Sequence, residues 1–377
     1  MKRIVKITIF GLFFGLILLY NGGALAEETG EGARAYVLLE AKTGRVLDAW
    51  NENEPLPMAS TTKIMTALIA LEQGDLQDTV TAGKNAFGVP GTSIYLAQGE
   101  QLTLEQMLYG LMLASGNDAA VAIAEHIGGT VEGFCERMNQ RAREIGCQNT
   151  AFATPHGLPA EGHYTTAYDL ALIAREAMKL PAFREIVSTQ RASIPWAGHE
   201  YSRVLTNKNQ LLSTYPGALG IKTGYTKAAG RCLAFAAERD GMELIGVVLN
   251  CPNWFGEAAA LLDRGFANWQ MATILSAGET VRQVPVTGGS QRSVALVAQR
   301  DVAAPVPIDR WPDLVLNIPD SLPAGIRAGQ MLGEARLMDG SETLISVPLV
   351  AAEDVEERSF RRGWERLEAR WPLAAGE

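Results

Sequence analysis

A serine and a lysine three residues apart could supply a nucleophile and the base that activates it. Ser60 and Lys63 stand at the start of a predicted helix, where residues three apart share a face and their side chains can meet. Lysine acts as a base only if its pKa falls, which burial and neighbouring cations can cause. The pair alone is weak evidence, because Ser-x-x-Lys arises by chance in chains of this length.

Two further triplets strengthen this prediction. Ser-Gly-Asn at 115–117 joins two predicted helices, so a hydroxyl and a carboxamide can face a cleft from that connection. Lys-Thr-Gly at 222–224 leads into the last strands of the domain, as an edge strand lining the same cleft would. Each triplet also occurs in ordinary turns and strand ends. Their order and spacing together are a strong joint signal for one catalytic site built around a nucleophilic serine.

Strands at both ends of residues 29–276, with helices between them, predict an α+β domain. Its antiparallel sheet would combine an N-terminal and a C-terminal hairpin, flanked by helices. The expected hairpins pair residues 34–41 with 45–50 and 233–237 with 244–249. The apolar spacing predicts helices over residues 60–72, 104–114, 118–127, 131–145, 166–178 and 255–272.

Residues 278–350 have a different pattern, which predicts a small all-β domain, a β-sandwich. The expected strands span residues 281–286, 294–298, 314–318, 333–337 and 343–350. Residues 353–377 follow as a predicted amphipathic helix, because Phe360, Trp364, Leu367 and Trp371 fall on one helical face among arginines. We expect this helix to anchor the protein to an anionic membrane surface, although it could instead dock on its own β domain.

The first 26 residues have the pattern of a secretory signal peptide. Basic residues precede an apolar run from Ile7 to Tyr20, and the small residues Ala24 and Ala26 flank the expected cleavage site. An uncleaved anchor is the alternative, but the apolar run is short for a membrane span. We therefore expect an exported protein that acts on the outer side of the cytoplasmic membrane.

Composition narrows the possible chemistry. The net charge of −9 argues against a nucleic-acid partner, which requires a basic surface. The four histidines lie outside any Gly-x-Ser-x-Gly or His-Glu-x-x-His pattern, so a serine–histidine hydrolase or a zinc peptidase is poorly supported, and we expect no metal or other cofactor. Disulfides are possible, but we favour four buried free thiols. The cysteines are Cys135, Cys147, Cys232 and Cys251.

The three motifs and their flanks resemble the penicillin-recognising serine enzymes, and within them the low-molecular-mass D-alanyl-D-alanine carboxypeptidases. The similar segments are Met58–Ala67, Leu113–Ala120, Pro155–Leu158, Thr166–Ala171 and Gly220–Thr226. The resemblance implies a β-lactamase/transpeptidase-like fold, a peptidoglycan stem peptide as substrate, and β-lactam antibiotics as covalent inhibitors.

The resemblance also implies roles for eight residues. Ser60 would attack the carbonyl between the two terminal D-alanines, Lys63 would take its proton, and Ser115 would relay a proton to the leaving amine. Asn117 would hold a substrate amide, and the backbone N–H groups of Ser60 and Tyr225 would form the oxyanion hole. Lys222, Thr223 and Gly224 complete the expected substrate-binding strand. His156 and Asp169 also match the family pattern, and we expect structural roles for both.

Two alternatives and one departure remain open at this stage. A class A β-lactamase shares the motif order, but needs a deacylating glutamate in a region that here is residues 151–158, without an acid. A penicillin-binding sensor without turnover is the non-enzymatic alternative, which the intact motifs disfavour. Some family members carry a carboxylate-binding arginine just after the last core strand, and residues 252–255 lack one.

Overall fold

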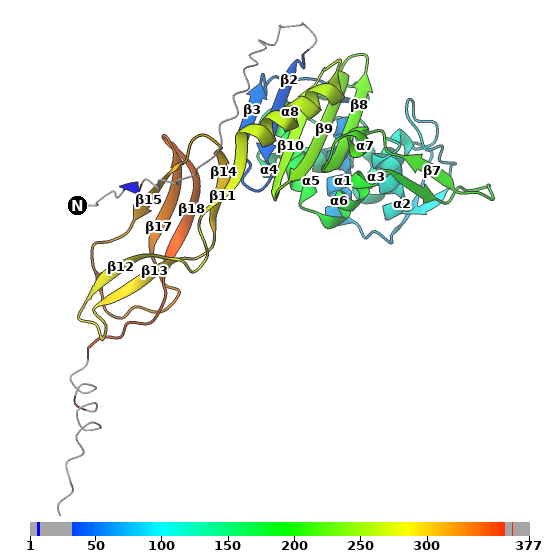
Figure 1. Ribbon diagram of the computed structural model, residues 1–377. Helices are drawn as coiled ribbons and strands as arrows, with labels where there is room; N and C mark the ends of the chain where they lie inside the picture. The colour runs from blue at the N-terminus through cyan, green and yellow to red at the C-terminus, as the bar shows by residue number, and fades with distance from the viewer. Residues whose placement is uncertain (1–5, 8–31, 359–363, 365–377) are drawn as a thin grey trace, which may run out of the picture. The chain divides into compact units, whose positions relative to one another are not determined.

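The computed structural model describes residues 6–7, 32–358 and 364, and divides the chain into two compact units (Figure 1). Among the described residues, one unit is residues 32–269, and the other contains residues 270–358 together with residues 6–7 and 364. Most of the predicted signal peptide and most of the predicted terminal helix therefore lie outside the described residues. Within the part of the chain that is described, no helix is long and apolar enough to cross a membrane.

The first unit is built on a five-stranded antiparallel sheet in the order β3-β2-β10-β9-β8. These strands are β2 (Ala35–Glu40), β3 (Val46–Trp50), β8 (Ala218–Thr226), β9 (Gly230–Arg239) and β10 (Met242–Leu249). Both predicted hairpins are present, and the Lys-Thr-Gly triplet lies on the edge strand β8, as expected. The α+β fold class is therefore confirmed for this unit.

Residue alternation buries both faces of this sheet. Val37 and Ile245 belong to the large core shared with the helices, whereas Leu38 and Leu244 point to the opposite face. There they contact α8 (Trp254–Asn268) at Gly265, where even a β-carbon would lie within 2.7 Å of both leucines. The glycine therefore allows α8 to pack closely on the sheet, as Figure 1 shows.

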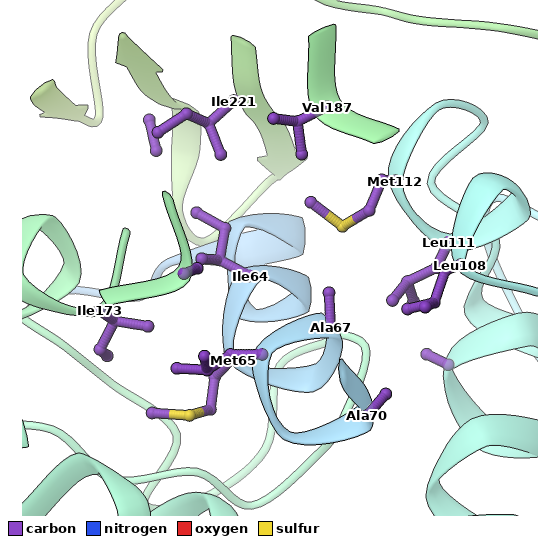
Figure 2. Packing of buried hydrophobic residues seen from close by; sticks show 14 of the residues in the cluster. Ile64, Met65, Ala67, Ala70, Leu108, Leu111, Met112, Ile173, Val187 and Ile221 are labelled. Atoms are coloured by element: carbon purple, nitrogen blue, oxygen red, sulfur yellow. The ribbon is translucent and has the colours of Figure 1, made fainter. Parts of the chain in front are cut away.

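The other face carries the helices that hold the first two motifs. They are α1 (Lys63–Gln73), α2 (Leu104–Met112), α3 (Asn117–Gly128), α4 (Val131–Ile145), α5 (Ala167–Met178) and α6 (Pro181–Ser188). The central helix α1 contacts the other five. In Figure 2, Met65 lies beside Ile173 of α5, and Ala67 faces Leu111 of α2. Lys63 is thus the first residue of a helix buried in the core.

Several short elements were not anticipated from the sequence pattern. They are the helix α6, the short helix α7 (Leu211–Thr214), and two small hairpins, β4 (Thr79–Thr81) with β5 (Gln101–Thr103) and β6 (Arg191–Ile194) with β7 (Arg203–Thr206). Strands of three or four residues are too short to show a two-residue period. The predicted helix over 255–272 ends earlier, because the chain turns into β11 (Trp269–Leu275).

The second unit is all-β, with a seven-stranded sheet, a pair formed by β11 and β14, and its own apolar core. The sheet contains β1 (Lys6–Ile7), β12 (Thr280–Thr287), β13 (Ser293–Ala298), β15 (Asp313–Asn317), β16 (Leu322–Pro323), β17 (Met331–Asp339) and β18 (Glu342–Ala351). The five predicted strands are present. The alanine- and proline-containing β14 (Val302–Pro307) was missed because it has no alternation.

The borders of this domain differ from those we expected. It begins near residue 270 rather than 278, because β11 pairs with β14. It also extends past residue 350: Val355 bridges Ile326, Glu357 bridges Gly289, and the Arg358 N–H donates to the Gly288 carbonyl. Residues 353–358 are therefore extended rather than helical, which corrects the predicted start of the terminal helix.

Candidate active site

Ser60 lies in a tight 3-10 turn, Ala59–Thr62, directly before α1. The hydroxyls of Thr61 and Thr62 donate to the carbonyls of Met58 (2.6 Å) and Ala59 (2.8 Å), which fixes the turn from within. Ser60 is partly exposed, whereas Lys63 is completely buried behind it. The turn therefore presents a hydroxyl to solvent while its partner amine is shielded from it.

The Lys63 amine has three oxygen neighbours. Its Nζ lies 3.0 Å from Ser60 Oγ, 2.7 Å from Asn117 Oδ1 and 2.7 Å from the His156 carbonyl oxygen. Burial, followed by the positive charges of Lys222 and Lys208, holds the Lys63 pKa well below its ordinary value, and Asp118 opposes the shift. The environment therefore favours the neutral amine, which can act as a base.

The loop between α2 and α3 carries Ser115, and Asn117 is the first residue of α3; both are buried. Ser115 has a φ of 65°, a left-handed conformation that is uncommon for serine. The Asn117 backbone N–H donates to the Thr92 carbonyl, and its side-chain Nδ2 donates to the Pro90 carbonyl at 2.6 Å. The carboxamide is thus held at both ends, by Pro90 and by Lys63, so Asn117 positions the lysine, a role that sequence reasoning did not assign.

Strand β8 approaches the nucleophile from the other side. A β-carbon on Gly224 would lie 2.8 Å from the Ser60 backbone nitrogen, so only glycine allows the strand to pass so close. Lys222, two residues earlier, is buried, and burial with the charge of Lys208 lowers its pKa to about 7. Thr223 is nearly buried, whereas Tyr225 is 63% exposed. The third motif therefore lies against the first, as its position on the edge strand predicted.

Residues 155–158 complete the surroundings of Lys63. The Thr66 hydroxyl donates to the Pro155 carbonyl, and the His156 carbonyl contacts Lys63. A β-carbon on Gly157 would lie only 1.9 Å from the Ala59 carbonyl oxygen, so this loop packs directly on the turn that carries Ser60. The oxygen that this loop places on Lys63 is a backbone carbonyl, and residues 151–158 contain no acidic side chain.

His156 and Asp169 have the structural contacts we expected. The His156 ring accepts a hydrogen bond from the Leu158 N–H, and burial lowers its pKa to about 4. Asp169 accepts from the backbone of residues 148 and 149 and from the Thr150 hydroxyl. Asp169 therefore anchors the chain that leads into the loop at 155–158.

Two cations near the site were missed by sequence reasoning. Lys208, after β7, is close enough to lower the pKa of both Lys63 and Lys222. Arg231, the direct partner of Tyr225 across β9, donates to the Pro252 carbonyl at 2.7 Å and lies 5.9 Å from the Trp254 ring. The Arg231 guanidinium therefore lies beside residues 252–255, although those residues include no arginine. Neither cation is part of a recognisable motif, so only the fold could reveal them.

The four cysteines are free and take no part in this arrangement. Burial raises the pKa of each thiol, to between about 11 and 12. Cys147 is only partly buried. The described residues contain no group of three or more histidine, cysteine or acidic side chains that could bind a metal ion.

A partly exposed serine beside a buried lysine whose pKa is lowered, faced by an edge strand that carries a second lysine, defines a serine acyl-transfer enzyme of the Ser-Lys type. Comparison with known proteins agrees. The profile of the D-alanyl-D-alanine carboxypeptidase family matches residues 25–253, and that of the C-terminal domain of penicillin-binding protein 5 matches residues 269–357. The chain belongs to the D-alanyl-D-alanine carboxypeptidase family.

Individual relatives cover nearly the whole chain. It is 33% identical to the D-alanyl-D-alanine carboxypeptidase DacF of Bacillus subtilis, over 98% of this chain and 99% of the relative. Identity to DacC of Escherichia coli is 32%, over 89% and 88% of the two chains. The crystal structure of penicillin-binding protein 5 from Haemophilus influenzae superposes with a TM-score of 0.73 at 32% identity, covering 86% of this chain and 98% of that one.

Proposed function

We propose that this protein is a serine carboxypeptidase that removes the terminal D-alanine from peptidoglycan stem pentapeptides through an acyl-enzyme. The contact between Lys63 Nζ and Ser60 Oγ, 3.0 Å apart, carries this proposal, together with membership of the family. Relatives named D-alanyl-D-alanine carboxypeptidase match over almost their entire length, which supports the same activity here.

The contacts of Lys63 explain how it can act as a base. A neutral amine has two N–H donors and one lone pair. The Asn117 and His156 oxygens, each 2.7 Å away, accept the two N–H groups, which leaves the lone pair for the Ser60 hydroxyl proton. Ser60 Oγ then attacks the carbonyl between the two D-alanines as its proton moves to Lys63.

The backbone of Ser60 and Tyr225 is suited to stabilising the tetrahedral intermediate. Gly224 brings β8 against the Ser60 backbone nitrogen, so the N–H groups of Ser60 and Tyr225 can converge on one oxyanion. When this intermediate collapses, the bond from carbonyl carbon to nitrogen breaks. The leaving amine takes a proton through Ser115, which lies two residues from Asn117, while Lys222 supplies positive charge. Water then hydrolyses the ester on Ser60 and restores the enzyme.

Asn117 also binds the substrate, in addition to positioning Lys63. Its Nδ2 carries two hydrogens, and the Pro90 carbonyl accepts one of them. The second hydrogen is available to a carbonyl of the substrate backbone. A single carboxamide would thus connect the base to the bound peptide.

The carboxylate of the terminal D-alanine needs a counter-charge that the sequence pattern did not identify. Thr223 offers a hydroxyl on the edge strand, and Lys208 and Arg231 lie beside that strand. We assign the carboxylate to Thr223 and Lys208. Arg231 supplies further positive potential from the side of Trp254.

Penicillin distinguishes this function from its nearest rival. A carboxypeptidase of this type should be acylated on Ser60 by a fluorescent penicillin and keep the label, because residues 151–158 supply no glutamate to activate a deacylating water. Rapid release of hydrolysed drug would instead indicate a β-lactamase. Labelling that persists without any D-alanine release from a pentapeptide would indicate a sensor.

We also propose export by the first 26 residues and peripheral anchoring by the segment after residue 358. Trp364, Trp371 and the arginines around them suit an anionic membrane interface. Deletion of residues 359–377 removes this segment and retains the contacts of Val355 and Glu357 with the β domain. The shortened protein should move from the membrane fraction to the soluble fraction, and an unchanged distribution would contradict anchoring.

A further inference from the structure

His163 is a buried histidine that the proposed mechanism does not use. It is 7% exposed and lies just before α5, with its ring at the edge of Phe152. Ring atom Nδ1 accepts a hydrogen bond from the Ala153 backbone N–H at 3.1 Å. Since Nδ1 is the acceptor, the ring hydrogen belongs on Nε2, which lies 2.9 Å from the Thr62 hydroxyl oxygen.

The direction of the next hydrogen bond follows. With Nε2–H donating to Thr62 Oγ1, the Thr62 hydroxyl hydrogen is free to donate to the Ala59 carbonyl oxygen, 2.8 Å away. The chain of donors therefore runs from the Ala153 backbone through His163 and Thr62 to the Ala59 carbonyl. Every group in it has a defined partner, which makes the arrangement stiff.

The Ala59 carbonyl belongs to the same peptide unit as the Ser60 N–H. A trans peptide is planar, and its C=O and N–H point in opposite directions. Any group that fixes the Ala59 carbonyl therefore also fixes the direction of the Ser60 N–H. Gly157, whose added β-carbon would lie 1.9 Å from that carbonyl oxygen, packs on it from the opposing loop.

The peptide needs such support because Ala59 is in an unfavourable conformation. Its φ is 49°, in the left-handed region that alanine rarely adopts. Without external contacts this residue would tend to relax, and the peptide that follows it would rotate. The Thr62 hydroxyl and the Gly157 backbone oppose that rotation.

We propose that His163 is a positioning residue for the oxyanion hole: through Thr62 it holds the Ala59 carbonyl, and thereby aims the Ser60 N–H at the developing oxyanion. This inference rests on the proposed acyl-transfer function. It assigns His163 a role in stabilising the transition state without contact to substrate.

Four variants of the full-length chain test it. His163→Leu removes the donor to Thr62, whereas His163→Gln keeps an N–H that can donate to the Thr62 hydroxyl. Thr62→Val removes the hydroxyl with little change of shape, and Thr62→Ser retains it. The measurements are kcat and KM for D-alanine release, the inhibition constant of a peptide boronic acid, and the fraction of sites labelled by fluorescent penicillin. The boronic acid forms a tetrahedral adduct with Ser60 Oγ, and one of its oxygens takes the oxyanion position.

His163→Leu and Thr62→Val should lower kcat by about 10- to 100-fold per labelled site, with little change in KM. Their affinity for the boronic acid should weaken by a similar factor. His163→Gln and Thr62→Ser should remain within about threefold of the wild type. If His163→Leu does not fold, the Thr62 pair provides the same comparison.

Two results would overturn the inference. The first is a fall in the labelled fraction alone, with normal kcat and boronic acid affinity in the sites that remain, because that describes a purely structural residue. The second is a loss of kcat without loss of boronic acid affinity. Failure of the proposed function looks different, because the wild-type protein itself would then release no D-alanine.

Discussion

Lys63 Nζ lies 3.0 Å from Ser60 Oγ. Its other two neighbours are Asn117 Oδ1 and the His156 carbonyl oxygen, which come from parts of the chain 54 and 93 positions after Lys63. This relationship explains why the site requires three separate segments. Asn117 and the His156 carbonyl occupy both N–H groups of the neutral lysine and leave its lone pair for the serine. The reactivity of Ser60 is thus a property of the assembled fold.

Replacement of Lys208 by glutamine should change both the pH profile and substrate binding. Lys208 lowers the pKa of Lys63, so its removal raises that pKa and keeps the base protonated to higher pH. The acid limb of kcat/KM should therefore move to higher pH, and KM for a pentapeptide should rise about tenfold as the carboxylate loses its partner. Lys227→Gln, which removes a lysine beyond the Lys-Thr-Gly motif, is the control. An unmoved acid limb would contradict the assigned electrostatics.

Asn117→Asp tests the role of the carboxamide in holding Lys63. A carboxylate in its place would stabilise the charged form of Lys63 and raise its pKa, so the rate of penicillin acylation at neutral pH should fall by at least about tenfold. The loss should shrink as the pH increases, since Lys63 then loses its proton. Asn117→Ala removes the contact without adding charge, so its acylation rate should fall without that recovery. The proposal fails if both variants share one pH profile.

Gly157→Ala should disrupt the packing of the 155–158 loop on the nucleophile turn. The added β-carbon would meet the Ala59 carbonyl oxygen at 1.9 Å, and the φ of +89° is itself unfavourable for alanine. We expect a loss of roughly 3 kcal/mol or more in unfolding free energy, with slower acylation. Gly162→Ala is a matched control, because Gly162 has a φ of +72° and no atom within 4 Å of the added carbon. Equal losses in both variants would show that only backbone conformation matters.

Stability should fall as the pH decreases from about 6.5 to about 4. Burial lowers the pKa of both His156 and His163 to about 4 in the folded protein, whereas the unfolded chain takes up protons from about 6.5. The unfolded state then binds more protons, so each histidine should contribute a loss of roughly 3 kcal/mol across this interval.

Urea unfolding at a series of pH values, compared between wild type and His163→Gln, isolates the contribution of His163 from that of the carboxylates. The variant should lose less stability than the wild type between pH 7 and pH 4. Parallel curves for the two proteins would contradict the neutral, buried state of His163.

The sequence predicted the fold class, both hairpins of the main sheet and most long helices, because these elements have strong periodicity and clear turns. It also predicted that Ser60 and Lys63 lie at the start of a helix and that Lys-Thr-Gly lies on an edge strand, as the structure shows. It misjudged the end of α8, since the apolar residues of β11 continue the helical pattern. The extended residues 353–358 were missed for a similar reason, because isolated bridges leave no period to detect.

The finer geometry of the site could not be derived from spacing. Three contacts depend on segments that meet only after folding. They are those of Lys63 with the Asn117 side chain, of Lys63 with the His156 carbonyl, and of His163 with Thr62. Gly157 and Gly224 could be noticed in the sequence because both are glycines within motifs. The reason that glycine is required became clear only from the backbone atoms that each one approaches. The positions of Lys208 and Arg231 near the site also became clear only from the fold.

Release of D-alanine from a stem pentapeptide is the most direct test of the central claim. The full-length protein should release one equivalent of D-alanine per peptide and then stop, and a peptide ending in L-alanine should be left intact. Ser60→Ala should reduce the rate to background, and Lys63→Ala should reduce it by at least about 1,000-fold. Absence of release by the wild-type protein, or release that persists in Ser60→Ala, would contradict the assignment of Ser60 as the nucleophile.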